Sequence, residues 1–97
     1  MNFEWDESKN KTNIEKHGID FETAALVFGD ENRLVFYDED HSLDEDRYIT
    51  IGSIKGTIII VMVVYTENDD VARIISARQA NNRERKVYVN GQEKNRY

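Results

Sequence analysis

The chain contains no cysteine and no proline among its 97 residues. Without cysteine it has neither a disulfide framework nor a thiolate metal site, a composition typical of a reducing compartment. Its longest apolar run is far shorter than the roughly 20 residues that span a bilayer, and residues 1–4 do not have the charged and apolar regions of a signal peptide. We therefore expect a cytoplasmic protein that does not enter the membrane.

A chain of this length forms one small domain with a modest hydrophobic core. No internal repeat, low-complexity tract or linker divides the sequence. We predict a single domain over residues 1–91, followed by a flexible tail over residues 92–97.

Charge is distributed unevenly along the chain, whose net charge is −6. Residues 1–70 hold 17 acidic and 6 basic side chains, a charge of −11, whereas residues 71–97 hold 2 acidic and 7 basic ones, a charge of +5. Such asymmetry suggests an anionic ligand for the second part and a cationic partner for the first. The alternative is the solvated charged surface of any small protein.

The centre of the chain is a predicted hairpin followed by a basic segment. Residues 58–65 are an unbroken apolar run rich in β-branched side chains, which predicts a strand buried on both faces. An acidic turn at 67–70 reverses the chain, residues 71–77 supply a second strand, and residues 83–86 lie in a basic helix. We place function at the seam between this strand and this helix.

Capping residues predict two helices in the first third of the chain. After a short strand at 3–5, Asp6 caps a helix that Gly18 ends, and Asp20 caps a second helix that Gly29 ends. The second helix carries one apolar stripe that must face a sheet or another helix, formed by Phe21, Ala24, Ala25 and Phe28.

We predict two more strands, at 33–37 and at 47–52, the second of which alternates between its two faces. The element order is then β, α, α, β, β, β, β, α, with short links between the strands. This order predicts an α+β fold of two layers: an antiparallel meander sheet with two N-terminal helices and one C-terminal helix packed on one face.

Residues 38–46 form an acidic block that includes His41. Three carboxylates beside an imidazole could hold a hard cation, but the segment has neither EF-hand spacing nor the glycine that such loops use for their sharp turn. We therefore predict a solvated loop, no metal site and no cofactor.

A series of motifs runs in order through nearly all of residues 3–88. It comprises Phe3-Glu4-Trp5-Asp6, Lys16-His17-Gly18, Phe21-Glu22-x-Ala24 with Val27-Phe28, Asp40-His41-Ser42, Asp46-Arg47-Tyr48-x-x-Ile51-Gly52, Val64-Tyr65-Thr66, and Arg73-Ile74-Ile75-Ser76-Ala77-Arg78-x-Ala80 with Arg83-Glu84-Arg85-x-x-Tyr88. Each fragment alone is weak, but as a set, with these spacings, they resemble the BrnT family of toxins.

The resemblance implies a type II toxin with a RelE-like fold that acts as a metal-independent ribonuclease. It also implies an RNA substrate and a hetero-oligomer with a BrnA-type antitoxin, which carries the DNA-binding module. One motif departs from the family pattern: where the family often has Glu-Arg-Trp, this chain has Asp46-Arg47-Tyr48, with a shorter acid and a different aromatic surface.

Metal-independent cleavage of RNA needs a base for the 2′-hydroxyl proton, cations for the phosphate charge, and a proton donor for the leaving oxygen. Arginine suits the second task, because its planar fork binds phosphate bidentately. We choose Arg78 for transition-state stabilisation, with Arg73 and Arg83 as phosphate-holding supports. Strand alternation sends Arg73 and Arg78 to opposite faces unless the strand bends or bulges between them.

The other candidate residues each have a structural alternative. Arg47 is a further catalytic candidate or an ion-pair partner of the acidic block. Tyr65 stacks on a base or belongs to the core. For the general base we consider the two histidines, His17 and His41, with Lys16 as a further candidate. His17 could instead interact with the carbonyls at the helix end.

Three functions from different classes remain open. They are a ribonuclease toxin, a non-catalytic module that binds RNA or a protein, and a structural interaction protein. We prefer the first because arginines gather at one seam of a small sheet and because of the resemblance.

Overall fold

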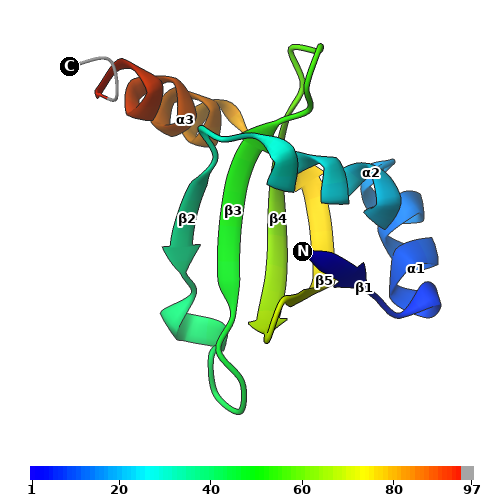
Figure 1. The fold of residues 1–97 in the computed structure, drawn as a ribbon. Helices are drawn as coiled ribbons and strands as arrows, with labels where there is room; N and C mark the ends of the chain where they lie inside the picture. Colours follow the sequence, from blue (N-terminus) through cyan, green and yellow to red (C-terminus); the bar gives the residue numbers. More distant parts are fainter. Residues whose placement is uncertain (95–97) are drawn as a thin grey trace.

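The computed structural model describes the backbone of residues 1–94 and the side chains of residues 1–91. The elements follow the predicted order (Figure 1). They are β1 (Asn2–Glu4), α1 (Glu7–His17), α2 (Phe21–Ala25) with the 3₁₀ turn η1 (Leu26–Gly29), β2 (Leu34–Tyr37), the 3₁₀ turn η2 (Glu39–His41), β3 (Tyr48–Ser53), β4 (Ile60–Asn68), β5 (Val71–Gln79) and α3 (Asn82–Lys94).

The strands form one sheet in the order β1-β5-β4-β3-β2. Strands β2 to β5 pair antiparallel in chain order, and β1 joins β5 in parallel at one edge. This arrangement confirms the α+β class and the meander. No helix in the described part of the chain is long and apolar enough to cross a membrane.

The predicted caps begin and end the first two helices. Asp6 accepts a hydrogen bond from the Lys9 amide, and Gly18 ends α1 in the left-handed conformation at φ 72°. Asp20 accepts from the Thr23 amide at the start of α2. These signals were readable from sequence because each cap is made within four residues of the chain.

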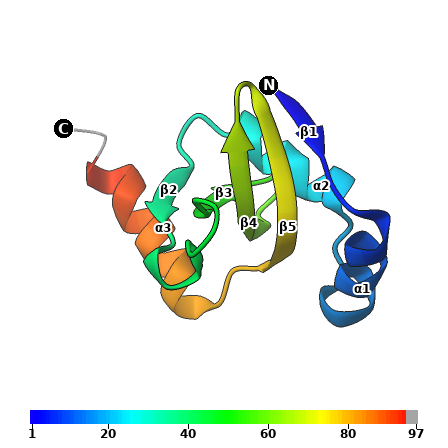
Figure 2. The same cartoon turned by 90° about the horizontal axis from the view of Figure 1, so that it is seen from below.

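The sheet carries a separate apolar cluster on each face. On one face, β4 contributes Val61 and Val63, which are fully buried against Phe21 and Val27 of α2 and η1. On the other face, Ile60 and Met62 of the same strand pack with Tyr88 of α3. In Figure 2, α2 and α3 lie on opposite sides of β3 and β4. The expectation that all helices share one face is therefore wrong for α3, because β4 is apolar on both sides and each side must be covered.

The boundaries of the central elements differ from those predicted. Ile58 lies before β4 and is 87% exposed. The buried strand therefore begins later than the apolar run at 58–65 predicts. The hairpin turn is tighter than predicted, with Asp69 at φ 52°. Helix α3 continues to Lys94, three residues past the predicted domain end, and the rest of the predicted tail, residues 95–97, lies outside the described residues.

A β-bulge interrupts β5 next to β4. Val64 pairs with Ser76 and Tyr65 pairs with Ile74, so Ile75 has no partner on β4. One extra residue reverses the alternation that follows it. Arg73 therefore pairs with Thr66 and Arg78 with Met62, and both arginines lie on the face that α3 partly covers.

Candidate functional site

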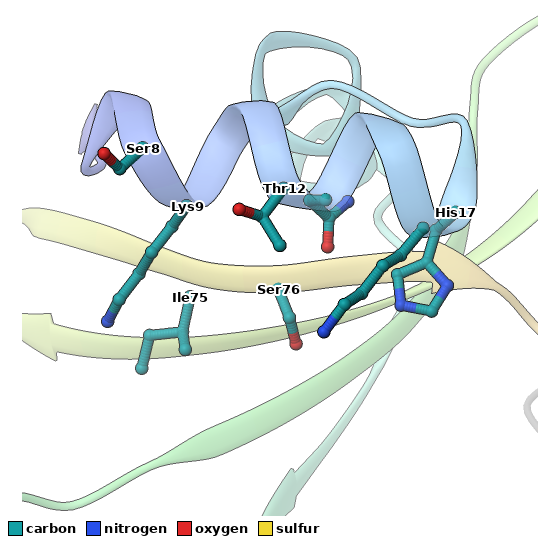
Figure 3. Close-up of a pocket in the computed structure, with 8 residues that line it drawn as sticks. Ser8, Lys9, Thr12, His17, Ile75 and Ser76 are labelled. Atoms are coloured by element: carbon teal, nitrogen blue, oxygen red, sulfur yellow. The ribbon is translucent and has the colours of Figure 1, made fainter.

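A groove of about 360 Å³ runs between α1 and β5. Figure 3 shows side chains of α1, including Lys9 and His17, extending across β5 beside Ile75 and Ser76. The lining residues are Ser8, Lys9, Thr12, Asn13, Lys16, His17, Ile75 and Ser76. None of these eight described residues is acidic, although the protein as a whole carries a net charge of −6.

Helical spacing and one buried side chain explain how α1 forms this wall. Lys9, Thr12, Asn13 and Lys16 follow the i, i+3, i+4, i+7 pattern of a single helix face. Asn13 is only 5% exposed and donates to the carbonyls of Ile19 and Ala77 at 2.8 and 2.7 Å. Its side-chain oxygen accepts from the Ala77 amide at 3.1 Å. The Asn13 side chain thus satisfies the backbone groups of Ala77 that a neighbouring strand would otherwise bind. This attachment holds Lys9 and Lys16 of α1 next to β5.

Arg78 lies on β5 past Ile75 and Ser76, the strand residues that line the groove, and it forms an ion pair with a carboxylate. It pairs with β4 on the same face as Ser76, two residues along β5. Its guanidinium donates to both carboxylate oxygens of Glu84, at 2.8 and 2.9 Å. The Arg78 side chain is nevertheless 35% exposed.

Glu84 belongs to the N-terminal cap of α3. It accepts from the Asn81 amide at 2.9 Å, while its own amide donates to the Asn81 side chain at 2.9 Å, which is a capping box. Hydrogen bonds from Arg78 lower the pKa of Glu84 despite partial burial, and the Asn81 amide lowers it further. Arg78 is therefore fixed to the start of α3 through an ionised carboxylate.

The other predicted arginines do not meet in one pocket. Arg73 pairs with Glu4 of β1 at 3.5 Å, and both side chains are about half exposed. Arg83 is exposed in the first turn of α3. Arg47 lines a different pocket formed by the acidic block, together with His41 and Leu43.

Tyr65 lies in the core rather than at the surface. It is 3% exposed, and its ring packs edge-on against Phe28 and beside Tyr48. The ring is therefore not accessible for stacking on a base, and the structural alternative describes its position.

The structure thus brings Lys16 and His17 together with Ser76, places Arg78 nearby on the same face, and leaves Arg47 apart. We did not identify Lys9, Ser8 and Thr12 from the sequence. The helical spacing of Lys9 and Lys16 was the available signal, but nothing local indicated which strand that helix face would meet. Among the described residues, no group of three His, Asp or Glu side chains is placed to hold a metal ion.

A second polar cluster joins α3 to the loop before β2. The Tyr88 hydroxyl donates to Asp30 at 2.6 Å, and Asp30 also accepts from the Ser53 amide at 2.8 Å. Burial opposes ionisation of Asp30, but the hydrogen bonds from Ser53, Tyr88 and Asn32 outweigh it and lower the pKa. Burial and the neighbouring Asp30 raise the pKa of Tyr88. This cluster fixes α3 against the sheet, and no sequence signal pointed to it.

Comparison with known proteins agrees with the fold and the motifs. The family model of the ribonuclease toxin BrnT of type II toxin–antitoxin systems matches residues 5–84. The crystal structure of the Brucella abortus ribonuclease toxin BrnT, at 1.1 Å resolution, is similar to this chain, with 32% sequence identity and a TM-score of 0.65. The similarity covers 84% of this chain and 97% of that one. No curated protein gives a significant match. The chain therefore belongs to the BrnT family of ribonuclease toxins of type II toxin–antitoxin systems.

Proposed function

We propose that this toxin is a metal-independent endoribonuclease of the cytoplasm, and that the groove between α1 and β5 holds the scissile phosphate. The observation that carries the proposal is the lining of the groove: two lysines, one histidine and no acid among eight described residues of an acidic protein. Such a lining attracts the phosphates of RNA, which supply most of the affinity for nucleic acids.

The groove also offers the groups that the chemistry needs. His17 is a candidate base for the 2′-hydroxyl proton, with Lys16 as the alternative, and Lys9 and Lys16 balance the negative charge that develops on the phosphate. Attack of the 2′-oxygen on phosphorus breaks the bond to the 5′-oxygen, which takes up a proton from water. The products are a 2′,3′-cyclic phosphate and a free 5′-hydroxyl.

Arg78 has donors left for this task. A guanidinium carries five N–H groups; two of those of Arg78 bind Glu84, and a third points to the Gln79 carbonyl at 3.3 Å. The Nε–H and one terminal N–H remain for a phosphate at the end of the groove. Arg73 and Arg83 are not among the residues that line the groove and would contact flanking phosphates.

The donor set supports cleavage without a metal ion. Divalent cations such as Mg²⁺ bind through carboxylate and carbonyl oxygens, whereas the charged groups that line this groove are cationic. Electrostatic repulsion from Lys9 and Lys16 disfavours a divalent cation at the place where RNA would lie.

A cleavage assay tests the proposal. Purified toxin is incubated with labelled single-stranded RNA in excess EDTA, and the ends of the fragments are identified. We expect 2′,3′-cyclic phosphate ends, and a strong loss of activity in His17→Ala or Lys16→Ala. The matched controls His41→Ala and Lys11→Ala, exposed residues outside the groove, should retain it. Cleavage that appears only when Mg²⁺ is added would refute metal independence.

A second function is favoured by one observation. Arg73 and Arg78 each have a carboxylate partner, which leaves less of their charge to stabilise a transition state, so the groove lysines would bind RNA without cleaving it. Intact RNA, with an affinity that falls steeply as salt rises, would support this non-catalytic module.

A type II toxin has a cognate antitoxin, and we propose that it is a BrnA-type chain that supplies DNA binding to a hetero-oligomer. An antitoxin that inhibits directly would cover the cationic groove with carboxylates. Co-expression of the antitoxin should restore growth. Loss of this rescue when the antitoxin's acidic residues are neutralised would support this arrangement.

A further inference from the structure

Strand β2 is the outermost strand of the sheet, on the edge opposite the α1–β5 groove (Figure 1). Its side chains Val35, Phe36 and Tyr37 are 49%, 42% and 49% exposed. Because neighbouring residues of a strand point to opposite faces, this edge presents apolar surface on both sides.

The backbone of β2 is also unpaired on its outer side. Phe36 faces Ile49 of β3, and the Asp38 amide donates to the Arg47 carbonyl at 2.9 Å. Backbone groups of a strand alternate in direction, so the N–H and C=O groups of Val35 and Tyr37 point away from β3. No strand in the described part of the chain pairs with them.

Edge strands are usually protected by charges, prolines or bulges, or by a covering helix or loop. Strand β2 reads Leu-Val-Phe-Tyr, with neither charge nor proline, and its register with β3 is regular. Helix α3 lies against its first residue, where Gly91 is next to Leu34. The three residues that follow Leu34 are about half exposed.

The acidic block, residues 38–46, follows β2 directly and holds six carboxylates, with Arg47 just beyond it. We propose that the outer edge of β2 accepts an extended segment of the cognate antitoxin as a sixth strand, with apolar side chains against Val35–Tyr37 and lysines or arginines against the acidic block. Strand addition of this kind supplies backbone hydrogen bonds for affinity and side-chain contacts for specificity.

Charge complementarity selects this occupant over two others. A second copy of the chain offers the acidic block no opposite charge: paired in parallel it would bring a second acidic block against the first, and paired antiparallel it would bring residues 30–33, which hold two acids and one arginine. Like charges brought together oppose association. RNA would be repelled by the same carboxylates. The proposal rests on family membership and on β2, and it does not depend on where RNA is cleaved.

Amide hydrogen exchange, measured by NMR on the free toxin and on the co-purified toxin–antitoxin complex, tests the proposal. We expect the Val35 and Tyr37 amides to exchange rapidly in the free toxin and at least about tenfold more slowly in the complex. The Phe36 amide, which faces β3, is the internal control and should be protected in both. Equal exchange of Val35 and Tyr37 in the two samples would overturn the proposal.

Matched substitutions supply a second readout. Val35→Lys places a cation on the edge and should weaken antitoxin binding by about tenfold or more, equal to about 1.4 kcal/mol. Ile58→Lys, at a residue that is 87% exposed in the loop between β3 and β4, should change it by less than about twofold. Thermal unfolding verifies that both variants are folded. Unchanged affinity of Val35→Lys would overturn the proposal, as would a homodimer of the free toxin that Val35→Lys dissociates.

Discussion

The guanidinium of Arg78 and the carboxylate of Glu84 form two parallel hydrogen bonds, of 2.8 and 2.9 Å, across the junction of β5 and α3. Both side chains are partly exposed, at 35% and 21%. The pair joins the strand that forms the groove to the capping box that begins α3. It sits at the seam where the sequence placed function, and it gives Arg78 a structural role as well as a proposed catalytic one.

Arg78→Ala should therefore lower stability. Removal of the guanidinium leaves Glu84 with the Asn81 amide alone, and we expect a loss of about 1–2 kcal/mol. The midpoint of urea unfolding measures this loss. Arg83→Ala, at an exposed arginine of α3, is the control and should change stability by less than about 0.5 kcal/mol. A stability of Arg78→Ala equal to that of the unmodified toxin would show that the pair contributes nothing.

Arg78→Lys separates the two roles. Lysine keeps the charge beside Glu84 but does not offer the planar fork that binds a carboxylate and a phosphate together. We expect kcat to fall by about 10² or more, while KM changes little. Glu84→Gln keeps the shape and leaves the guanidinium intact, so it should retain more activity than Arg78→Lys. The reverse order would assign Arg78 to the scaffold alone.

The lysines of the groove should set the salt dependence of RNA binding. The logarithm of the RNA-binding constant falls linearly with the logarithm of the salt concentration. Each phosphate contact that is lost makes this line less steep, by about 0.7–1 in slope for a single strand. Lys9→Ala and Lys16→Ala should each lower it by this amount. Lys11→Ala, on the same helix but outside the groove, should leave it unchanged. Equal slopes for all three variants would place the RNA elsewhere.

Asn13 should be essential for the attachment of α1. Asn13→Ala leaves the buried amide of Ala77 and two carbonyls without their partner, and we expect a loss of about 2–3 kcal/mol. Thr12→Ala, an exposed change on the next residue, should cost less than about 0.5 kcal/mol. Urea unfolding of both variants tests the difference, and similar midpoints would mean that water replaces the lost hydrogen bonds.

Stability should depend on pH at both ends of the range. The pKa values of Asp30 and Glu84 lie below their ordinary values of 3.8 and 4.5 in the folded protein, so their contribution is present above those values and is lost as the pH falls through the folded pKa values. The pKa of Tyr88 lies above 10.0, so its contribution is present below pH 10.0 and is lost as the pH rises through the folded pKa.

Unfolding midpoints measured across this range should therefore fall below about pH 4.5 and again above about pH 10. Asp30→Asn should make the fall of the midpoint at acid pH (the acid limb) less steep. Tyr88→Phe should do the same for the fall at alkaline pH. An acid limb unchanged in Asp30→Asn would assign the acid sensitivity to other carboxylates.

Structural features that depend on residues only a few positions apart could be predicted from the sequence. The caps at Asp6, Gly18 and Asp20 and the alternation around Ile49 and Ile51 each report on local geometry, so the element order and the α+β class were read correctly. Errors arose where burial decides the outcome. Ile58 is apolar but exposed. Tyr65 lies in the core because its position on β4 faces η1, and the residue type alone does not indicate this.

The sequence alone determined the order of the elements, the family motifs and the presence of cations near the end of β5, because these depend on neighbouring residues. Only the tertiary structure decided which cations share a surface. The bulge at Ile75 places Arg73 and Arg78 on one face, and Asn13 brings Lys9 and Lys16 to β5 through hydrogen bonds between residues 64 positions apart. Contacts at that separation depend on how the whole chain packs, and no local pattern of residues encodes them.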